Sequence, residues 1–151
     1  MNKYISQCDT NLGALNQRSQ DCLPHLLGVR FTAIGPDFII GEMPVNERTR
    51  QPHGLLHGGA SIVLAETLGS VSSTLLVMHE EGTRVVGVEV SGSHLRGVRD
   101  GKVTGVCRAL KLGRTMHFWQ INIYDQEWQL CCSARLAVNV SRGPVPAGHG
   151  E

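Results

Sequence analysis

The chain has 151 residues, a length typical of one domain, and 41% hydrophobic against 18% charged residues is a globular rather than a disordered balance. Fourteen Lys and Arg residues against 13 Asp and Glu give a net charge of +1, which argues against an extended nucleic-acid-binding surface. No apolar run is long enough for a signal-peptide core or a membrane span, and the five irregularly spaced cysteines indicate reduced thiols, so we expect a cytoplasmic protein.

The first 57 residues are expected to form short helices, a β-hairpin and a polar loop. Residues 3–27 are expected to hold one or two helices. Two strands, 29–33 and 38–45, flank Gly35-Pro36-Asp37, whose residue types are those of a hairpin turn. The polar residues 46–57 are expected to be a loop.

The longest helix is expected from about Ala60 to Met78. Its apolar residues cover much of the helix circumference, which is typical of a buried helix. Glu66 and Ser70 interrupt this apolar character, and because they are four residues apart they share one face. Alternation of Val, Ile, Trp and Tyr then predicts four strands. These are residues 83–95, 102–111, 115–125 and 129–140.

The order of hairpin, long helix and four strands predicts an α+β fold, in which an antiparallel β-sheet wraps around one long central α-helix. We expect a single domain over residues 1–140. Residues 141–151 contain Gly and Pro without periodicity and are expected to form a flexible C-terminal tail.

Two features near the long helix point to chemistry. Gly58 and Gly59 leave backbone N–H groups bare at the helix start, where they can stabilise an oxyanion; the alternative is a simple glycine turn. Glu66 places a carboxylate in an apolar helix, which is costly unless it is paired or functional. An ion pair with an arginine or a solvent-facing position are its structural alternatives.

The spacing of Gly58 and Glu66 constrains any shared role. Eight residues separate them, which is about 12 Å along a helix. If both belong to one helix, they cannot touch the same carbonyl carbon. A reaction that uses both therefore needs a site shared by two subunits, which predicts an obligate dimer with antiparallel central helices.

The segment from Gln51 to Ser70, together with the segment from Gly87 to Arg96, resembles the aryl-CoA hotdog thioesterases. Within this family the similarity is to enzymes of menaquinone biosynthesis that act on 1,4-dihydroxy-2-naphthoyl-CoA, and to the proofreading thioesterases of enterobactin synthesis. The resemblance covers residues 12–140. Its other motifs are Met43-Pro44-Val45, Arg48-Thr49, Lys102 to Cys107, Leu112-Gly113-Arg114 and Leu130-Cys131-Cys132.

The resemblance implies a hotdog fold and hydrolysis of an aromatic acyl-CoA to the free acid and CoA. Glu66 matches the catalytic carboxylate, which attacks the thioester carbonyl or activates a water. Gly58 matches the residue whose N–H polarises that carbonyl. Gln51 and His57 match a polar pair that positions the acyl group and helps the thiolate leave. Ser70 matches the hydroxyl that holds the hydrolytic water.

His94 matches an active-site histidine of the subfamily, and Arg96, Lys111 and Arg114 are candidate partners for the CoA phosphates. The resemblance also implies a homotetramer built as a dimer of dimers, with its sites at the dimer interface. It implies no cofactor besides the CoA of the substrate, and an acyl carrier protein is a second candidate donor. The expected substrate or CoA contacts are Gly87, His94, Leu95, Arg96, Gly97, Lys111, Leu112, Gly113, Arg114, Thr115 and Met116.

Some alternative interpretations of the function stay open. A hotdog hydratase would also use polarised carbonyls, with His57 and Glu66 moving protons, and a non-catalytic acyl-CoA-binding module would lack Glu66. His53 and His57 have the spacing of helical metal ligands, but Pro52 and Gly54 oppose a helix there and the spacing implies no third ligand, so we expect no metal. His53 replaces a Phe of close relatives. Val71 resembles the naphthoyl-CoA branch, since the proofreading branch has Met at this position.

Overall fold

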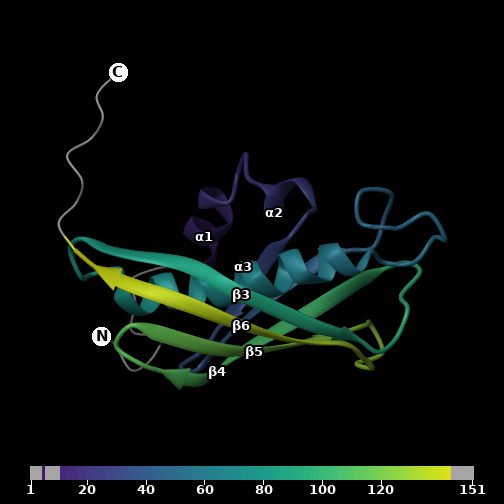
Figure 1. Ribbon diagram of the computed structural model, residues 1–151. Coiled ribbons are helices and arrows are strands. Elements are labelled where there is room, and N and C mark those ends of the chain that lie inside the picture. The colour runs from purple at the N-terminus through teal and green to yellow at the C-terminus, as the bar shows by residue number, and fades with distance from the viewer. Residues whose placement is uncertain (1–4, 6–10, 144–151) are drawn as a thin grey trace.

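The computed structural model describes Ile5 and residues 11–143, which form one antiparallel sheet with a long helix lying along it (Figure 1). The strand order is β1–β2–β4–β5–β6–β3, so β1 and β3 are the two edges. This is the predicted α+β arrangement. Its elements are α1 (Leu12–Arg18), α2 (Leu23–Leu26), β1 (Arg30–Ile34), β2 (Phe38–Pro44), α3 (Gly58–Val77), β3 (Thr83–His94), β4 (Lys102–Leu112), β5 (Met116–Tyr124) and β6 (Leu130–Arg142).

The central helix begins two residues earlier than the sequence predicted. His57 is its N-cap: the imidazole Nδ1 accepts a hydrogen bond from the Gly59 N–H at 2.8 Å, and the His57 carbonyl accepts from Ala60 and Ser61. This cap satisfies N–H groups that the first helical turn leaves open, so the helix starts at Gly58 rather than Ala60.

The last strand continues beyond its predicted end at residue 140. Arg142 still pairs with Thr83 across the sheet, and its Nε donates to Glu80 Oε2 at 2.7 Å. These contacts hold 141 and 142 in β6, so the strand ends two residues later than the sequence predicted. The rest of the predicted tail, 144–151, lies outside the described residues, as does most of the predicted helical segment before residue 11.

The core forms where α3 meets the inner face of the sheet. Leu64 and Leu68 of α3 are fully buried, and burial of each such side chain contributes about 1.5–3 kcal/mol to the stability of the fold. Gly41 and Gly105 lie beneath them, and a Cβ at either position would come within 3 Å of a Leu68 methyl group. The missing side chains let the helix lie close to the strands, which fixes its position along the sheet.

By length and mean hydropathy α3 could cross a membrane, but 61% of that apolar stretch is buried inside the fold. The helix is therefore the core of this domain, enclosed by strands on one side. In Figure 1, α1 and α2 lie on the side of α3 away from the sheet.

A buried polar cluster joins α3 to β5. Ser73 Oγ accepts a hydrogen bond from Trp119 Nε1 at 2.8 Å and lies 3.1 Å from His117 Nδ1. His117 is fully buried, and its Nε2 has no hydrogen-bond partner among the described residues. Burial, helped by the positive charge of Arg142, lowers the pKa of His117 below its ordinary value of 6.5.

The buried His117 is expected to make the fold sensitive to acid. Because its pKa is lower in the folded chain, the unfolded chain binds the proton more tightly, and stability is lost as the pH falls below 6.5. Denaturant unfolding at pH 7.5 and pH 5.5 tests this. The free energy of unfolding of the wild type should fall more than that of His117→Gln; equal losses would contradict it.

Candidate functional site

The start of α3 presents one free backbone donor. The Gly59 N–H is used by the His57 cap, whereas the Gly58 N–H has no acceptor among the described residues. It lies at the positive end of the helix dipole and is the donor available to an oxyanion. His57 itself is exposed, and its cap leaves only Nε2 for a substrate.

A hollow of about 350 Å³ opens beside Gly58 and gathers six of the predicted residues. They come from three separate segments: the loop before α3, the helix start, and the end of β3 with the chain that follows it. Sequence reasoning did not identify four other residues that line it. The predicted residues are Gln51, Gly58, His94, Leu95, Arg96 and Gly97, and the others are Leu55, Leu56, Ser61 and Cys131.

His94 lies directly over the helix start. A Cβ on Gly58 would be 2.7 Å from His94 Nε2, so only glycine leaves room for the imidazole at this distance. The ring and the free N–H therefore face the same hollow and can act on one group. We call this arrangement of Gln51, Gly58 and His94 the helix-start half-site.

Glu66 and Ser70 line a different hollow, of about 400 Å³, farther along the same helix. Glu66 is exposed in the single chain and has no ion-pair or hydrogen-bond partner among the described residues, which excludes an arginine partner within them. The residues of α3 and α2 that line this hollow are mainly apolar. They are Leu23, Pro24, Val63, Glu66, Thr67, Ser70 and Val71.

Gly87 of β3 lies against the Glu66 carboxylate. A Cβ at position 87 would be 2.9 Å from Glu66 Oε1, so the glycine lets the acid lie on the bare strand. We call Glu66, Ser70 and Gly87 the carboxylate half-site. Val71, the position that the sequence linked to substrate choice, faces this hollow, whereas His53 is exposed and lines neither one.

The predicted CoA contacts also fall into two groups that lie far apart in one chain. The 111–116 turn joins β4 to β5 at the sheet end where β3 begins, because Met116 pairs with Asn139 and Asn139 with Val86. His94 lies eight residues farther along β3, about 26 Å away. Within one chain, the residues from Lys111 to Met116 are therefore not brought together with His94 to Gly97.

The N–H donor and the carboxylate that are expected to act on the thioester both belong to α3, and the length of helix between them keeps them apart. Gly58 and Glu66 belong to one continuous helix and are about 12 Å apart along its axis. A thioester carbonyl held at the Gly58 N–H cannot reach Glu66 of the same chain.

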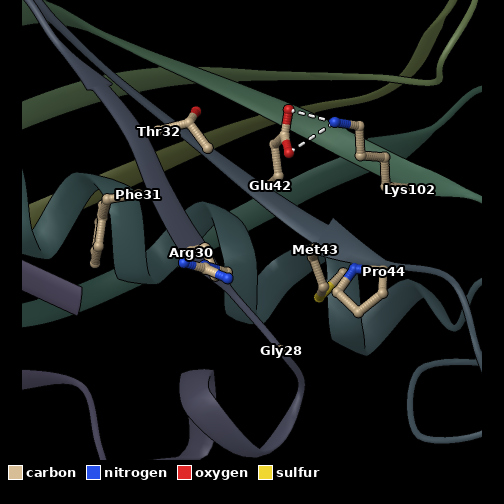
Figure 2. Close-up of a pocket in the computed structure, with 8 residues that line it drawn as sticks. All are labelled: Gly28, Arg30, Phe31, Thr32, Glu42, Met43, Pro44 and Lys102. Carbon is tan, nitrogen blue, oxygen red and sulfur yellow. Dashed lines mark hydrogen bonds and ion pairs between the residues drawn. The ribbon is translucent and has the colours of Figure 1, made fainter. Parts of the chain in front are cut away.

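One further hollow on the sheet lies apart from both half-sites. A hollow of about 440 Å³ crosses β1, β2 and β4, where Glu42 and Lys102 point toward each other in an ion pair of 2.8 Å (Figure 2). It contains none of the predicted site residues. Within 11–143, no cluster of three His, Cys, Asp or Glu side chains could hold a metal ion.

Comparison with known proteins gives consistent matches. The thioesterase superfamily model matches residues 53–132. The 1,4-dihydroxy-2-naphthoyl-CoA hydrolase of Escherichia coli is 46% identical over 85% of this chain and 93% of its own length. The proofreading thioesterase EntH of Cronobacter turicensis is 49% identical over the same shares of the two chains.

Solved structures agree. A thioesterase from Haemophilus influenzae superimposes with a TM-score of 0.86 at 42% identity, covering 92% of this chain and 96% of that one. A variant of a Pseudomonas aeruginosa thioesterase gives 0.85 at 45% identity, over 87% and 94% of the two chains. The chain thus belongs to the thioesterase superfamily and is a thioester hydrolase with the hotdog fold.

Proposed function

We propose that this thioester hydrolase cleaves an aromatic acyl-CoA at a site formed by two copies of the chain. The observation that carries the proposal is the division of the site residues. The helix-start half-site holds a free N–H donor, and the carboxylate half-site holds an unpaired acid, but one helix separates them. A second copy in antiparallel orientation supplies the missing half to each.

The edge strand β3 is the surface that fits this second copy. It is 12 residues long, its outer edge has no partner strand within the described part of the chain, and Val86 and Val88 on it are exposed. A long apolar edge of this kind favours pairing with another strand. Since β3 carries both Gly87 and His94, pairing two β3 strands joins the half-sites directly.

The side of the sheet to which each β3 residue points restricts the register in which two β3 strands can pair. Gly87, Gly92 and His94 face α3, as their contacts with Glu66, Ile62 and Gly58 show. Opposite residues of an antiparallel pair face the same side. A two-fold axis at Ser91 places residues that face the same side opposite each other. It sets His94 of one chain opposite the Gly87–Val88 bulge of the other chain, next to the Glu66 of that other chain.

In the shared site, the acyl carbonyl oxygen accepts the Gly58 N–H of one chain, and the partner contributes the carboxylate of Glu66. That carboxylate either attacks the carbonyl carbon, forming an anhydride that water then hydrolyses, or removes a proton from an attacking water held by Ser70. The C–S bond breaks, a C–O bond forms, and CoA leaves as the thiolate and takes up a proton. Gln51 and the remaining His57 nitrogen lie on the helix-start side to assist that departure.

An aromatic acyl group suits the carboxylate hollow, whose walls include Leu23, Val63 and Val71. CoA as the donor is supported by the name of the E. coli relative, and a carrier-protein donor is the alternative. Arg96 on one chain, with Lys111 and Arg114 on the other, can bind phosphates. The reaction needs no cofactor beyond the CoA of its substrate. We place the protein in the cytoplasm.

A hydrolysis panel tests the assignment. Naphthoyl-CoA, benzoyl-CoA and straight-chain acyl-CoA are compared by kcat/KM, with release of free thiol as the readout, because a hydratase releases none. The aryl thioesters should be the best substrates. If a straight-chain thioester exceeds all of them by about tenfold, or ~1.4 kcal/mol of barrier, the aromatic assignment is wrong.

The β3 register predicts a symmetric cross-link. In a background with Cys8 and Cys22 replaced by serine, Ser91→Cys should form a disulfide between chains, because directly opposite residues lie within disulfide range. Ser93→Cys is the matched control, since position 93 then faces Glu89 and not itself. Non-reducing electrophoresis after mild oxidation gives the result; efficient cross-linking at 93 but not at 91 would contradict the register.

A further inference from the structure

The turn between β4 and β5, which contains one group of the predicted CoA contacts, is bound to the end of β6. The Thr115 carbonyl accepts a hydrogen bond from the Val140 N–H at 2.8 Å. The Arg114 carbonyl accepts one from Nη1 of Arg142. Because the C=O and N–H of a trans peptide point in opposite directions, the Thr115 N–H, in the same peptide plane as the Arg114 carbonyl, points away from β6. It has no acceptor among the described residues.

Arg142 is itself held in place by Glu80, from the turn after α3. Its Nε donates to Glu80 Oε2 at 2.7 Å, and the two side chains are only 33% and 28% exposed. This hydrogen bond lowers the pKa of Glu80 below its ordinary value of 4.5, so the carboxylate is charged at neutral pH. Since a guanidinium is a rigid planar fork, binding of Nε by Glu80 fixes the direction in which Nη1 meets the Arg114 carbonyl.

The side of the turn away from β6 offers groups that suit a phosphate. Lys111 and Arg114 are exposed and form no ion pair with another described residue, and the Thr115 N–H is free. Antiparallel pairing of two β3 strands sets the start of one beside the end of the other. The turn of one chain therefore lies at the same end of the joint sheet as residues 94–97 of the other chain.

We propose that Arg142 is a positioning residue for the CoA phosphates. Together with Glu80 it fixes the peptide between Arg114 and Thr115, so that the Thr115 N–H and the cations of the turn receive a phosphate of the CoA whose thioester lies at the helix-start half-site of the other chain. The opposite charges of Arg142 and Glu80 offset each other, so the pair acts through geometry rather than through added positive charge. This inference rests on the CoA donor and the β3-paired dimer proposed above.

Arg142→Met tests the proposal, because methionine keeps an unbranched side chain and removes every donor. Hydrolysis of an aryl-CoA is compared with that of the same acyl group on pantetheine, which lacks the nucleotide and its phosphates. The KM for the aryl-CoA should rise about tenfold, or ~1.4 kcal/mol, the size of one hydrogen bond. The kcat and the KM for the pantetheine thioester should stay unchanged, whereas a defect of the fold alone would affect both substrates alike.

Lys102→Met is the matched control for loss of a cation and of an ion pair. Lys102 pairs with Glu42 at 2.8 Å and lies at the opposite end of β4 from the turn, so both KM values should remain those of the wild type. Thermal unfolding of each variant shows whether it is folded.

Glu80→Ala distinguishes positioning from direct binding of a phosphate by Arg142. Positioning predicts a higher KM for the aryl-CoA in Glu80→Ala, and a double variant no worse than Arg142→Met alone. Direct binding predicts a lower KM, because the guanidinium charge is no longer paired. A lower KM in Glu80→Ala overturns the proposal, as does an Arg142→Met variant whose two KM values are unchanged or rise equally. Equal KM values of the wild type for the two substrates would instead count against CoA as the donor, and the inference would fail with it.

Discussion

Replacing Glu66 by glutamine is expected to lower kcat by about 10²–10⁴-fold, the usual contribution of a positioned acid or base. The amide keeps the size of the side chain beside Gly87 and removes only the charge that attacks the carbonyl or takes a proton from water. Since Glu66 makes no ion pair or hydrogen bond among the described residues, stability should change little. Glu66→Ala should be equally impaired.

The measurement is free-thiol release from an aryl-CoA, with thermal unfolding of each variant as the check on folding. Glu81→Gln provides the matched control, because it removes an exposed carboxylate from the turn after α3 and should keep wild-type turnover. Retention of most of the turnover in Glu66→Gln would remove this carboxylate from the mechanism.

Replacing Gly58 by proline should give the second largest loss, about 10²–10³-fold relative to Gly58→Ala. Proline removes the N–H, yet it suits the first position of a helix, and His57 before it already has the extended conformation that a residue preceding proline prefers (φ −68°, ψ 131°). The helix start should therefore survive the substitution.

Alanine is the necessary comparison at this position. Its Cβ meets His94 Nε2 at 2.7 Å, as the proline ring also does, but it keeps the N–H. The activity of Gly58→Ala thus measures displacement of His94, and the further loss in Gly58→Pro measures the missing donor. Equal activities of the two variants would show that another group binds the oxyanion.

Much of the fold was predictable because local signals agree with the tertiary arrangement. Gly35-Pro36-Asp37 forms the predicted turn, with the Gly35 N–H donating to the Phe38 carbonyl, and the four later strands lie within two residues of their predicted bounds. The start of α3 was misplaced because its cap is the imidazole of His57, a residue outside the common capping types. The end of β6 was missed because its anchor, Glu80, is far away in the sequence.

The divided site was predictable in one respect only. The rise of an α-helix was enough to place Gly58 and Glu66 too far apart for one chain to use both. The matching division of the CoA contacts depends on strand order, which residue patterns do not determine. Val63 and Thr67 could have been assigned to the Glu66 hollow from helical spacing, whereas Leu23 and Pro24 reach it from α2 only through folding.

Mixed dimers test the shared site most directly. Glu66→Gln and Gly58→Pro are mixed in equal amounts in denaturant, refolded together and assayed by thiol release beside each variant refolded alone. Each mixed dimer holds one site with both halves intact, so random pairing should restore about a quarter of the wild-type turnover from two nearly inactive proteins. Activity no higher than the average of the two separate variants would show that each chain carries a complete site.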